Sequence, residues 1–470
     1  MKELDEIIQN YTELILFNFF QFCLIFYYTN QLLTPWFCVT INLMLELYQK
    51  LKNNPVIYIT RDIERALGLP LDTEGYFIIS NSTDFAKGLA AKQTNILLIN
   101  AERPLNTLEL LSRDETSGFI ERINKPNILV FKNNRLIEKI CKKRKWNLLN
   151  PSPELSAKVE EKIFQVEWLG ALAKYLPPHQ IQLCREVKWR NKPFILQFNT
   201  AHTGLGTIFI DAKEQLAEIQ NKFPKRPARV AKFIHGPIFT NNNIVAPDKI
   251  LIGNINYQIT GLSPFTDNPF ATIGNDWKLP RGSLSQKQIE QYHKIANDVG
   301  AKLRADGWKG LFGIDIILEE KTGRLYLLEI NARQPASAPY ESQLQRSAIS
   351  NKQSTCPPTG GSSKQIRQND QLPNYPITIF EAHLAALLNL DLSSYELIKI
   401  KAGAQIIQRI TAFRHTMSNE RINNIKHKGF NVIPYERNIA PGAELLRMQT
   451  AGSIMKSHNI LNKTASRLTL

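Results

Sequence analysis

GIDIILEEKTGRLYLLEIN, residues Gly313–Asn331, contains two apolar runs separated by a short polar segment. The polar segment, residues 319–324, carries several charges and a glycine, which is typical of a turn between two antiparallel strands. Asp315 lies in the first run, and Glu329 and Asn331 lie at the end of the second. Residues 329 and 331 share a face because strand side chains alternate with a period of two. The stretch therefore predicts a hairpin that places two carboxylates and one amide oxygen side by side.

This group of oxygen atoms is a candidate metal site. Mg²⁺ prefers oxygen ligands and usually completes its shell with substrate phosphates. Arg333 lies two residues beyond Asn331 on the same face and could hold a phosphate oxygen. Taken singly, these residues could be ordinary polar positions on a solvent-facing hairpin. Both strands are otherwise almost wholly apolar, however, and an unpaired buried carboxylate is costly. A metal ion or a cation is therefore expected beside Asp315 and Glu329.

The hairpin and its continuation, GIDIIL…GRLYLLEINARQPAS, resemble the metal-binding hairpin of the ATP-grasp superfamily. In that family, an acid on one strand and a Glu-x-Asn on the next hold the magnesium ions that bridge the phosphates of ATP. Residues 332–337 are most similar to the carbamoyl-phosphate-synthase and amino-acid-ligase branches. The resemblance extends from about residue 150 to residue 410. It implies Mg²⁺ (or Mn²⁺) ligands at Asp315, Glu329 and Asn331, and a catalytic role for Arg333.

Segments that resemble the family's nucleotide site lie upstream in the expected order. Residues 150–153 followed by Lys162 resemble the segment whose lysine reaches the ATP phosphates, so Lys162 is both a catalytic and an ATP-binding candidate. An apolar strand ending near Gln197 leads into a glycine loop and a second apolar strand. Such a hairpin can cover a triphosphate with backbone N–H groups, although an ordinary hairpin is the alternative for a loop of this kind alone. The implied nucleotide contacts here are Gln197, His202, Thr203, Gly204, Gly206 and Thr207. His202 either donates to phosphate or only fixes the turn.

Residues 231–239 resemble the hinge that binds the adenine edge through backbone groups. Lys232 matches the lysine that reaches over the base, and Phe233 and Ile234 follow it as ATP-binding candidates. The chain departs from the family pattern at three positions. Ala231 and Ile238 stand where family members often carry acids, and Gln197 stands where a phosphate-binding lysine is common. Because glutamine brings no charge, these departures bear on ATP affinity or on the choice of nucleotide, and they leave the metal site unaffected.

The chain is predicted to be an α/β protein with an α+β ATP-grasp core. Residues 46–150 alternate short apolar runs with amphipathic stretches, which indicates a parallel α/β sheet, a pre-ATP-grasp domain. No G-x-G-x-x-G follows its first strand, so the dinucleotide fingerprint is absent. Residues 151–345 are assigned to a two-lobed ATP-grasp domain and residues 346–375 to a flexible linker or lid. Residues 376–470 would complete that domain and add a small C-terminal lobe.

Residues 1–45 are an apolar N-terminal extension that does not fit this picture. Residues 14–28 are strongly apolar, but they are shorter than the roughly 20 residues that a bilayer helix needs. Acids precede this run and no A-x-A-like site follows it, so it is a poor signal peptide. Three interpretations are open: membrane contact through residues 14–45, an additional packing element, or sequence upstream of a mis-set start. Met44 would be a natural beginning for the sheet domain.

The composition is basic, with a formal net charge of +16 over 470 residues. A basic surface favours anionic partners. The one dense basic run, residues 142–145, is more typical of a solvated helix end than of a nucleic-acid interface, so nucleic acid is not an expected partner. The five cysteines are scattered without a C-x-x-C, which indicates neither disulfides nor zinc and fits a cytoplasmic protein. The oligomeric state cannot be inferred from these patterns.

The resemblance implies a ligase that depends on ATP and Mg²⁺. A carboxylate would become an acyl phosphate, an amine would displace phosphate, and ADP would be the other product. The partners would be a small carboxylate and a small amine. Two alternatives remain open: an ATP-grasp phosphotransferase, and a non-enzymatic nucleotide-binding regulator. The regulator remains an alternative because of the departures at Gln197, Ala231 and Ile238. The intact set of two acids and an amide argues against it.

Overall fold

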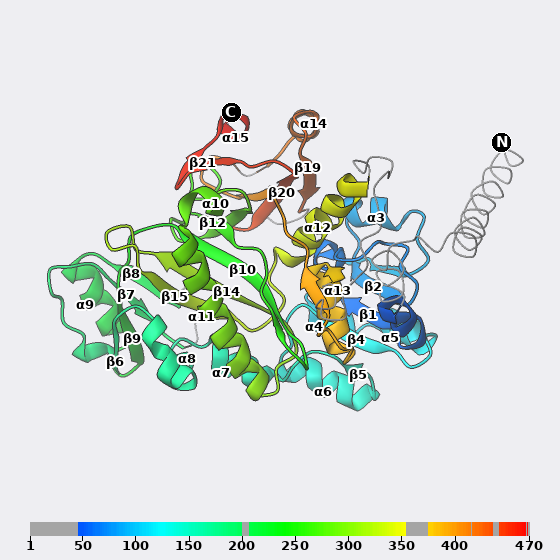
Figure 1. Ribbon diagram of the computed structural model, residues 1–470, viewed down its shortest axis with the longest axis horizontal. Coiled ribbons are helices and arrows are strands. Elements are labelled where there is room, and N and C mark those ends of the chain that lie inside the picture. Colours follow the sequence, from blue (N-terminus) through cyan, green and yellow to red (C-terminus); the bar gives the residue numbers. More distant parts are fainter. Residues whose placement is uncertain are drawn as a thin grey trace, which may run out of the picture.

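The protein contains three main sheets, which lie next to one another along the length of the molecule (Figure 1). The computed structural model describes residues 46–199, 206–353, 375–414, 416–435, 441–466 and 468. Within these residues, a five-stranded sheet, a four-stranded sheet and a nine-stranded sheet account for most strands. The five-stranded sheet lies at one end of the molecule, the nine-stranded sheet in the middle and the four-stranded sheet at the other end (Figure 1). This arrangement confirms the predicted α/β class.

The five-stranded sheet is parallel, with the order β3-β2-β1-β4-β5. Its strands are β1 (Val56–Ile59), β2 (Tyr76–Asn81), β3 (Ile96–Ile99), β4 (Asn127–Val130) and β5 (Asn147–Leu148). Its helices are η1 (Ile63–Ala66), α3 (Asp84–Ala90), α4 (Thr107–Leu111), α5 (Asp114–Glu121) and α6 (Arg135–Arg144). Side chains of β1 alternate between two cores: Ile57 and Ile59 pack with α4, α5 and α6, whereas Val56 and Tyr58 face the opposite core. Both faces are covered, which explains why the sequence of these strands is continuously apolar.

The nine-stranded sheet has the order β15-β14-β10-β12-β13-β18-β20-β19, with β11 paired to β10. Its strands are β10 (Ile238–Val245), β11 (Ile250–Leu251), β12 (Asn256–Thr260), β13 (Thr272–Asp276), β14 (Gly310–Leu318), β15 (Leu325–Asn331), β18 (Ala404–Arg409), β19 (Asn431–Pro434) and β20 (Glu444–Thr450). Because β13 pairs with β18, the strands after residue 404 continue the sheet that carries the predicted hairpin. The C-terminal part of the chain therefore shares the central sheet.

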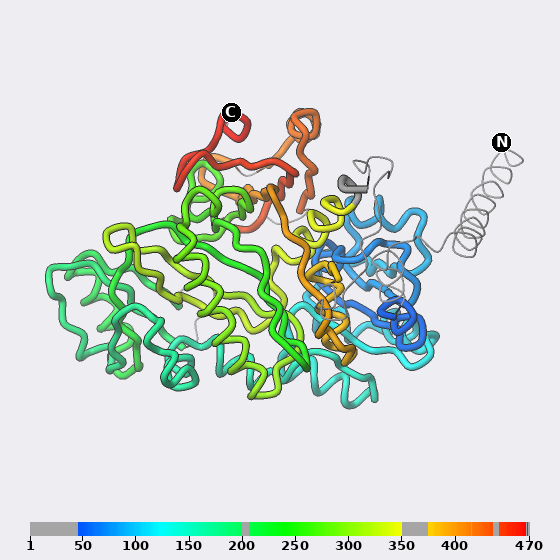
Figure 2. Tube along the Cα trace, in the orientation of Figure 1, coloured from blue at the N-terminus to red at the C-terminus, as the bar shows by residue number. Residues whose placement is uncertain are grey.

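Two helices pack against this sheet. α11 (Gln286–Ala305) begins at a capping box formed by Ser285 and Gln288 and buries an apolar stripe that includes Tyr292 and Val299. α13 (Ile379–Leu387) is buried at every position, because it lies between β10, β14 and the parallel sheet. The Cα trace in Figure 2 shows this orange segment between the blue and green parts of the molecule.

The four-stranded sheet is antiparallel, with the order β6-β9-β7-β8. Its strands are β6 (His179–Leu183), β7 (Phe194–Gln197), β8 (Thr207–Ile210) and β9 (Pro227–Lys232). Phe194, Leu196, Ile210 and Ala228 form a small core with Leu216 of α9 (Lys213–Lys222). One face of this sheet is therefore covered by α9, and the alternate side chains project from the other face.

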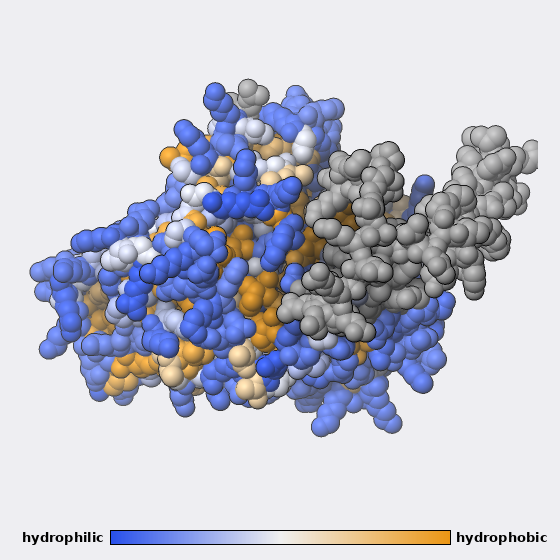
Figure 3. Space-filling view, viewed as in Figure 1, coloured by the Kyte–Doolittle hydropathy of each residue, from blue (hydrophilic) through white to orange (hydrophobic). Residues whose placement is uncertain are grey.

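The remaining elements connect or flank the sheets. They are α7 (Pro153–Glu160), α8 (Phe164–Leu169), η2 (Gly170–Tyr175), η3 (Cys184–Glu186), α10 (Pro280–Ser283), α12 (Ala338–Gln353), β16 (Tyr375–Ile377), β17 (Tyr395–Leu397), α14 (Asn419–His427), β21 (Met455–Ser457), β22 (Ile460–Leu461) and α15 (Lys463–Ser466). On the face shown in Figure 3, hydrophilic side chains cover most of the periphery.

The structure describes only part of the predicted linker, residues 346–375, and none of the N-terminal extension. α12 continues to Gln353, so the first eight residues of the expected linker, 346–353, are helical. In the first half of this helix, Tyr340 and Leu344 are buried in a cluster with Trp277, which follows β13 of the central sheet. The rest of the linker, residues 354–374, and the N-terminal extension lie outside the described residues. None of the helices in the described ranges combines the length and apolarity needed to cross a bilayer.

Candidate functional site

The predicted hairpin is formed by β14 and β15, and it brings the three candidate metal ligands together. Asp315 lies directly opposite Glu329, and a bulge follows between Asp315 and Ile316. Asn331 Nδ2 lies 3.4 Å from Asp315 Oδ2. The turn is closed by a hydrogen bond of 2.9 Å from Glu319 N–H to the carbonyl of Arg324.

The two carboxylates have opposite pKa shifts. Burial, together with the adjacent Glu329 charge, raises the pKa of Asp315 to about 6. Burial alone would also raise the pKa of Glu329, but the positive charges of Lys162 and Arg333 hold it below its ordinary value. Asp315 therefore takes up a proton at a higher pH than Glu329 does.

Two predicted cations lie beside this pair. Lys162 Nζ is 3.0 Å from Glu329 Oε1. The backbone after Lys162 is fixed by Asn199, whose Oδ1 accepts a hydrogen bond of 2.7 Å from the N–H of Ile163. Arg333 pairs with Glu160 at the end of α7. Glu160 also accepts a hydrogen bond of 2.5 Å from Lys132, which lies two residues after β4 of the parallel sheet. Glu160 therefore links Arg333 to that sheet.

The face of the four-stranded sheet that points away from α9 carries two rows of side chains across β8, β7 and β9. Register pairs Thr207 with Gln197 and Gln197 with Arg229, which gives a polar row. The neighbouring row, two residues along each strand, is apolar and consists of Phe209, Ile195 and Ala231.

The predicted hinge lies next to the apolar row. The rings of Phe209 and Phe233 are 4.6 Å apart. Ile234 is buried with Ile317 and Tyr326 of the hairpin. Among the described residues, none hydrogen-bonds the backbone of Phe233 or Ile234, so their N–H and C=O groups are available to a ligand.

Lys232 is held in place by the hairpin turn. Its Nζ lies 2.6 Å from Glu319 Oε1. That hydrogen bond holds the pKa of Glu319 below its ordinary value. Glu319, an acid of the turn, thus stands close to the hinge, where the acids expected at positions 231 and 238 are missing.

The glycine loop is described only in part. His202, Thr203 and Gly204 lie outside the described residues. Gly206 closes the loop, since its carbonyl accepts a hydrogen bond of 3.0 Å from the N–H of Phe198. Thr207 begins β8, where its Oγ1 accepts from Gln197 Nε2 at 3.0 Å.

The oxygen atoms of the hairpin suit a hard cation such as Mg²⁺. Two carboxylates and an amide oxygen are the donors that Mg²⁺ takes when phosphates and water complete its shell. No cluster of three or more His, Cys, Asp and Glu that could hold a metal ion occurs in the described ranges, so a softer ion such as zinc has no comparable site there.

Three charged residues next to this site were not predicted from the sequence: Arg229, Glu160 and Lys132. Arg229 had a usable signal, because it is a charged residue within the apolar strand ARVAK, the same signal that identified Asp315. No such signal marks Glu160 or Lys132, because each lies at or just beyond the end of an element and comes close to Arg333 only in the folded chain.

Comparison with known families agrees with the fold and the hairpin. The model of the ATP-grasp domain matches residues 159–337. This range contains the glycine loop, the hinge and the metal hairpin. Residues 159–337 are therefore identified as an ATP-grasp domain.

Solved structures with the same fold include three ligases. An N5-carboxyaminoimidazole synthase from Aspergillus clavatus, in complex with ADP and 5-aminoimidazole ribonucleotide, is 12% identical, with a TM-score of 0.55 over 84% of this chain and 93% of that one. An L-amino acid ligase from Bacillus licheniformis is 14% identical, with a TM-score of 0.54 over 84% and 92%. A phosphoribosylamine–glycine ligase from Thermotoga maritima is 13% identical, with a TM-score of 0.54 over 88% and 96%. No curated protein sequence matches this chain.

Proposed function

We propose that this protein is an ATP- and Mg²⁺-dependent ligase that joins a small carboxylate to a small amine. The carboxylate attacks the γ-phosphate of ATP and becomes an acyl phosphate, with ADP as the leaving group. The amine then attacks the acyl carbon, phosphate leaves, and the amine loses a proton. The observation that carries this proposal is the register of Asp315 opposite Glu329, with Asn331 beside them.

Phosphoryl transfer depends mainly on positioning and on charge neutralisation. Mg²⁺ held by Asp315, Glu329 and Asn331 would neutralise charge on the β- and γ-phosphates. Lys162, now paired with Glu329, lies where it can exchange that partner for a phosphate oxygen. Arg333 is kept in place by Glu160 and presents a guanidinium at the same edge of the hairpin.

The apolar row and the hinge support a planar base beside the phosphates. Phe209, Ile195 and Phe233 would contact its faces, and the unpaired backbone groups of Phe233 and Ile234 would bind its edge. Three of the proteins with this fold named above are ligases, and one of them was solved with ADP. These names support the ligase proposal over a phosphotransferase.

We place the acceptor substrates at the carboxyl ends of the parallel strands, where open α/β sheets bind ligands. A groove there is lined by Arg61, Asp62 and Asn81 of the parallel-sheet part and by Tyr435 of the C-terminal part. An adjoining hollow reaches Ala336, which follows Arg333 by three residues. The groove and the hollow together extend from the parallel sheet to the segment that follows Arg333.

Nucleotide product analysis tests the proposed function. Purified protein with Mg²⁺ and ATP is incubated with pools of amino acids and small carboxylates, and the products are separated. We expect ADP and phosphate only where a carboxylate and an amine are both present. ATP binding without turnover in any pool would favour a regulator, and AMP with pyrophosphate would contradict the acyl-phosphate mechanism.

A further inference from the structure

Arg229 is a buried cation without a carboxylate partner. Its side chain is 3% exposed. Its Nε and one terminal nitrogen donate to Gln197 Oε1 at 2.8 and 2.5 Å, and the other terminal nitrogen lies 3.5 Å from Gln165 Oε1. No carboxylate in the described ranges forms an ion pair with it. The neighbouring loop, residues 200–205, contains no acid in its sequence.

A buried charge held only by neutral amide oxygens is costly unless a counter-ion arrives. Gln165 and Gln197 compensate for part of that cost, since each is itself fixed: Gln165 Nε2 donates to the carbonyl of Val159 at 2.9 Å, and Gln197 Nε2 donates to Thr207. The three hydrogen bonds use three of the five N–H groups of a guanidinium, which leaves two for a ligand.

The position of Arg229 identifies the kind of counter-ion. It lies beside Gln197 in the polar row, on β9, which leads into the predicted hinge, and on the face of the four-stranded sheet that points away from α9. Glu329 of the hairpin is the acid whose charge acts on it. That carboxylate is already paired with Lys162. Arg333 is likewise paired with Glu160, so a ligand that supplies the missing counter-charge beside Arg229 would have to be anionic.

We propose that Arg229 binds the polyphosphate of the nucleotide and supplies, from β9, the positive charge that Gln197 does not supply from β7. Gln197 then acts as a positioning residue, because its amide oxygen orients the guanidinium. This inference rests on the proposed nucleotide site and adds a phosphate-binding residue to it. It also explains why a chain without a lysine at position 197 can keep a nucleotide site.

The test measures nucleotide binding by titration calorimetry, with no turnover required. The ligands are Mg²⁺–ADP and adenosine, and the protein is the full chain. Arg229→Gln removes the charge and keeps hydrogen-bonding atoms. We expect at least a tenfold weaker Kd for Mg²⁺–ADP and an unchanged Kd for adenosine. We expect the same or a higher Tm without ligand, since a buried charge has been removed.

A charge exchange provides the second variant. In Gln197→Lys/Arg229→Gln the cation moves from β9 to the paired position on β7. We expect this double variant to recover most of the lost affinity for Mg²⁺–ADP. Arg185→Gln, at an exposed arginine of η3 outside the two rows, is the matched control and should bind as the unaltered protein does.

Two outcomes would overturn the inference. One is unchanged Mg²⁺–ADP affinity in Arg229→Gln. The other is a lower Tm with equal losses for ADP and adenosine that the exchange does not recover, which would mean a structural role. Failure of the unaltered protein to bind any adenine nucleotide would instead contradict the proposed function itself, so the two failures can be distinguished.

Discussion

At the scale of single residues, the candidate site combines the acids of the β14–β15 hairpin with cations from the segments next to it. Lys162 and Arg333 are paired with Glu329 and Glu160, and Asp315 lies between Glu329 and Asn331. Because these acids and cations already pair with one another, the proposed nucleotide and Mg²⁺ would replace their contacts on binding. Single substitutions should therefore change binding and turnover more than they change folding.

Glu329→Gln should abolish turnover while the protein stays folded. The change removes the metal ligand that is held charged by Lys162 and Arg333, and it leaves the hairpin hydrogen bonds intact. Loss of an outer-shell partner of a metal typically costs about 10–100-fold, so loss of a direct ligand should cost more than about 100-fold in kcat. Steady-state ADP release measures this. Glu320→Gln in the exposed turn is the control, and turnover in Glu329→Gln that equals this control would contradict the metal assignment.

Mg²⁺ affinity should fall as the pH is lowered through about 6, the pKa to which burial and Glu329 raise Asp315. The raised pKa means that protons compete with the metal below about pH 6, whereas above it the carboxylate is charged and the affinity levels off. Each further pH unit below the pKa should weaken binding by about tenfold. Titration of Mg²⁺ between pH 5 and pH 8 checks this. A pH profile in Asp315→Asn identical to that of the unaltered protein would show that another group is responsible.

At the scale of elements, the proposed hinge is held directly against the hairpin formed by β14 and β15. Gly236 has φ +144°, and a Cβ there would lie 1.9 Å from the carbonyl oxygen of Leu318 at the end of β14. The N–H of Glu320 donates to the carbonyl of His235 at 3.1 Å, and Lys232 pairs with Glu319. The segment proposed to bind the base is therefore fixed directly to the strand that carries Asp315.

Gly236→Ala should disrupt the contact between the hinge and the end of β14. A methyl group at this position meets backbone, and the positive φ costs about 1–3 kcal/mol for a residue with a side chain. We expect a lower free energy of unfolding and weaker ADP binding, measured by chemical denaturation and calorimetry. Gly282→Ala is the control, because a Cβ at Gly282 meets nothing within 4 Å. Equal stability of the two variants would contradict the contact with Leu318.

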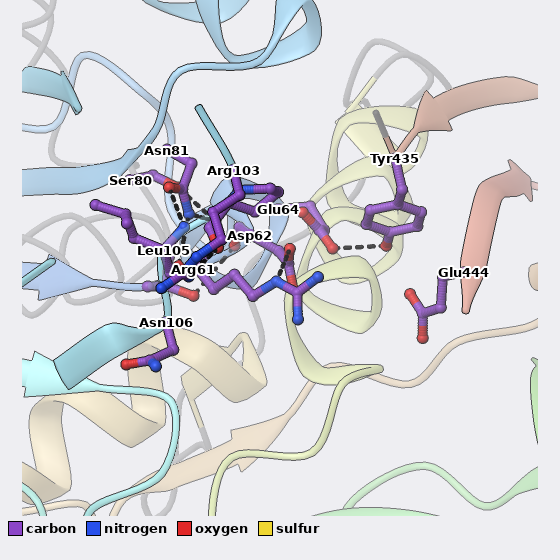
Figure 4. A network of polar contacts seen from close by, with 12 residues as sticks. Arg61, Asp62, Glu64, Ser80, Asn81, Arg103, Leu105, Asn106, Tyr435 and Glu444 are labelled. Atoms are coloured by element: carbon purple, nitrogen blue, oxygen red, sulfur yellow. Dashed lines mark hydrogen bonds and ion pairs between the residues drawn. The ribbon is translucent and has the colours of Figure 1, made fainter. Parts of the chain in front are cut away.

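At the scale of the whole molecule, the C-terminal strands close the carboxyl edge of the parallel sheet. Tyr435 donates a hydrogen bond of 2.6 Å to Glu64 and accepts one of 3.0 Å from Arg447, which is 2% exposed. Figure 4 shows Tyr435 pointing at Glu64 across this boundary, with Glu444 nearby. On the other side, Tyr58 donates to Gln334 at 2.9 Å, next to Arg333. The parallel sheet is thus joined both to the C-terminal strands and to the segment that contains Arg333.

Tyr435→Phe should lower the free energy of unfolding by weakening the contact between the parallel sheet and the C-terminal strands. The change deprives buried Arg447 and Glu64 of a shared partner, which typically costs about 1–3 kcal/mol. The measurement is the free energy of unfolding in denaturant. Tyr395→Phe is the control, since none of the described side chains hydrogen-bonds the Tyr395 hydroxyl. Equal stability of the two variants would mean that the Glu64–Tyr435–Arg447 contact adds nothing measurable.

The sequence by itself determined the local features of this protein. The alternation in Gly313–Asn331 was enough to predict the hairpin and the close approach of Asp315, Glu329 and Asn331, because strand periodicity and turn chemistry act over a few residues. The apolar runs before residue 150 predicted the parallel sheet for the same reason. Only the tertiary structure decided that Arg229 lies beside Gln197, that Glu160 pairs with both Arg333 and Lys132, and that strands after residue 404 complete the central sheet. Those relations depend on the register between distant strands, which is set by packing across the whole chain and leaves no signal in a local pattern.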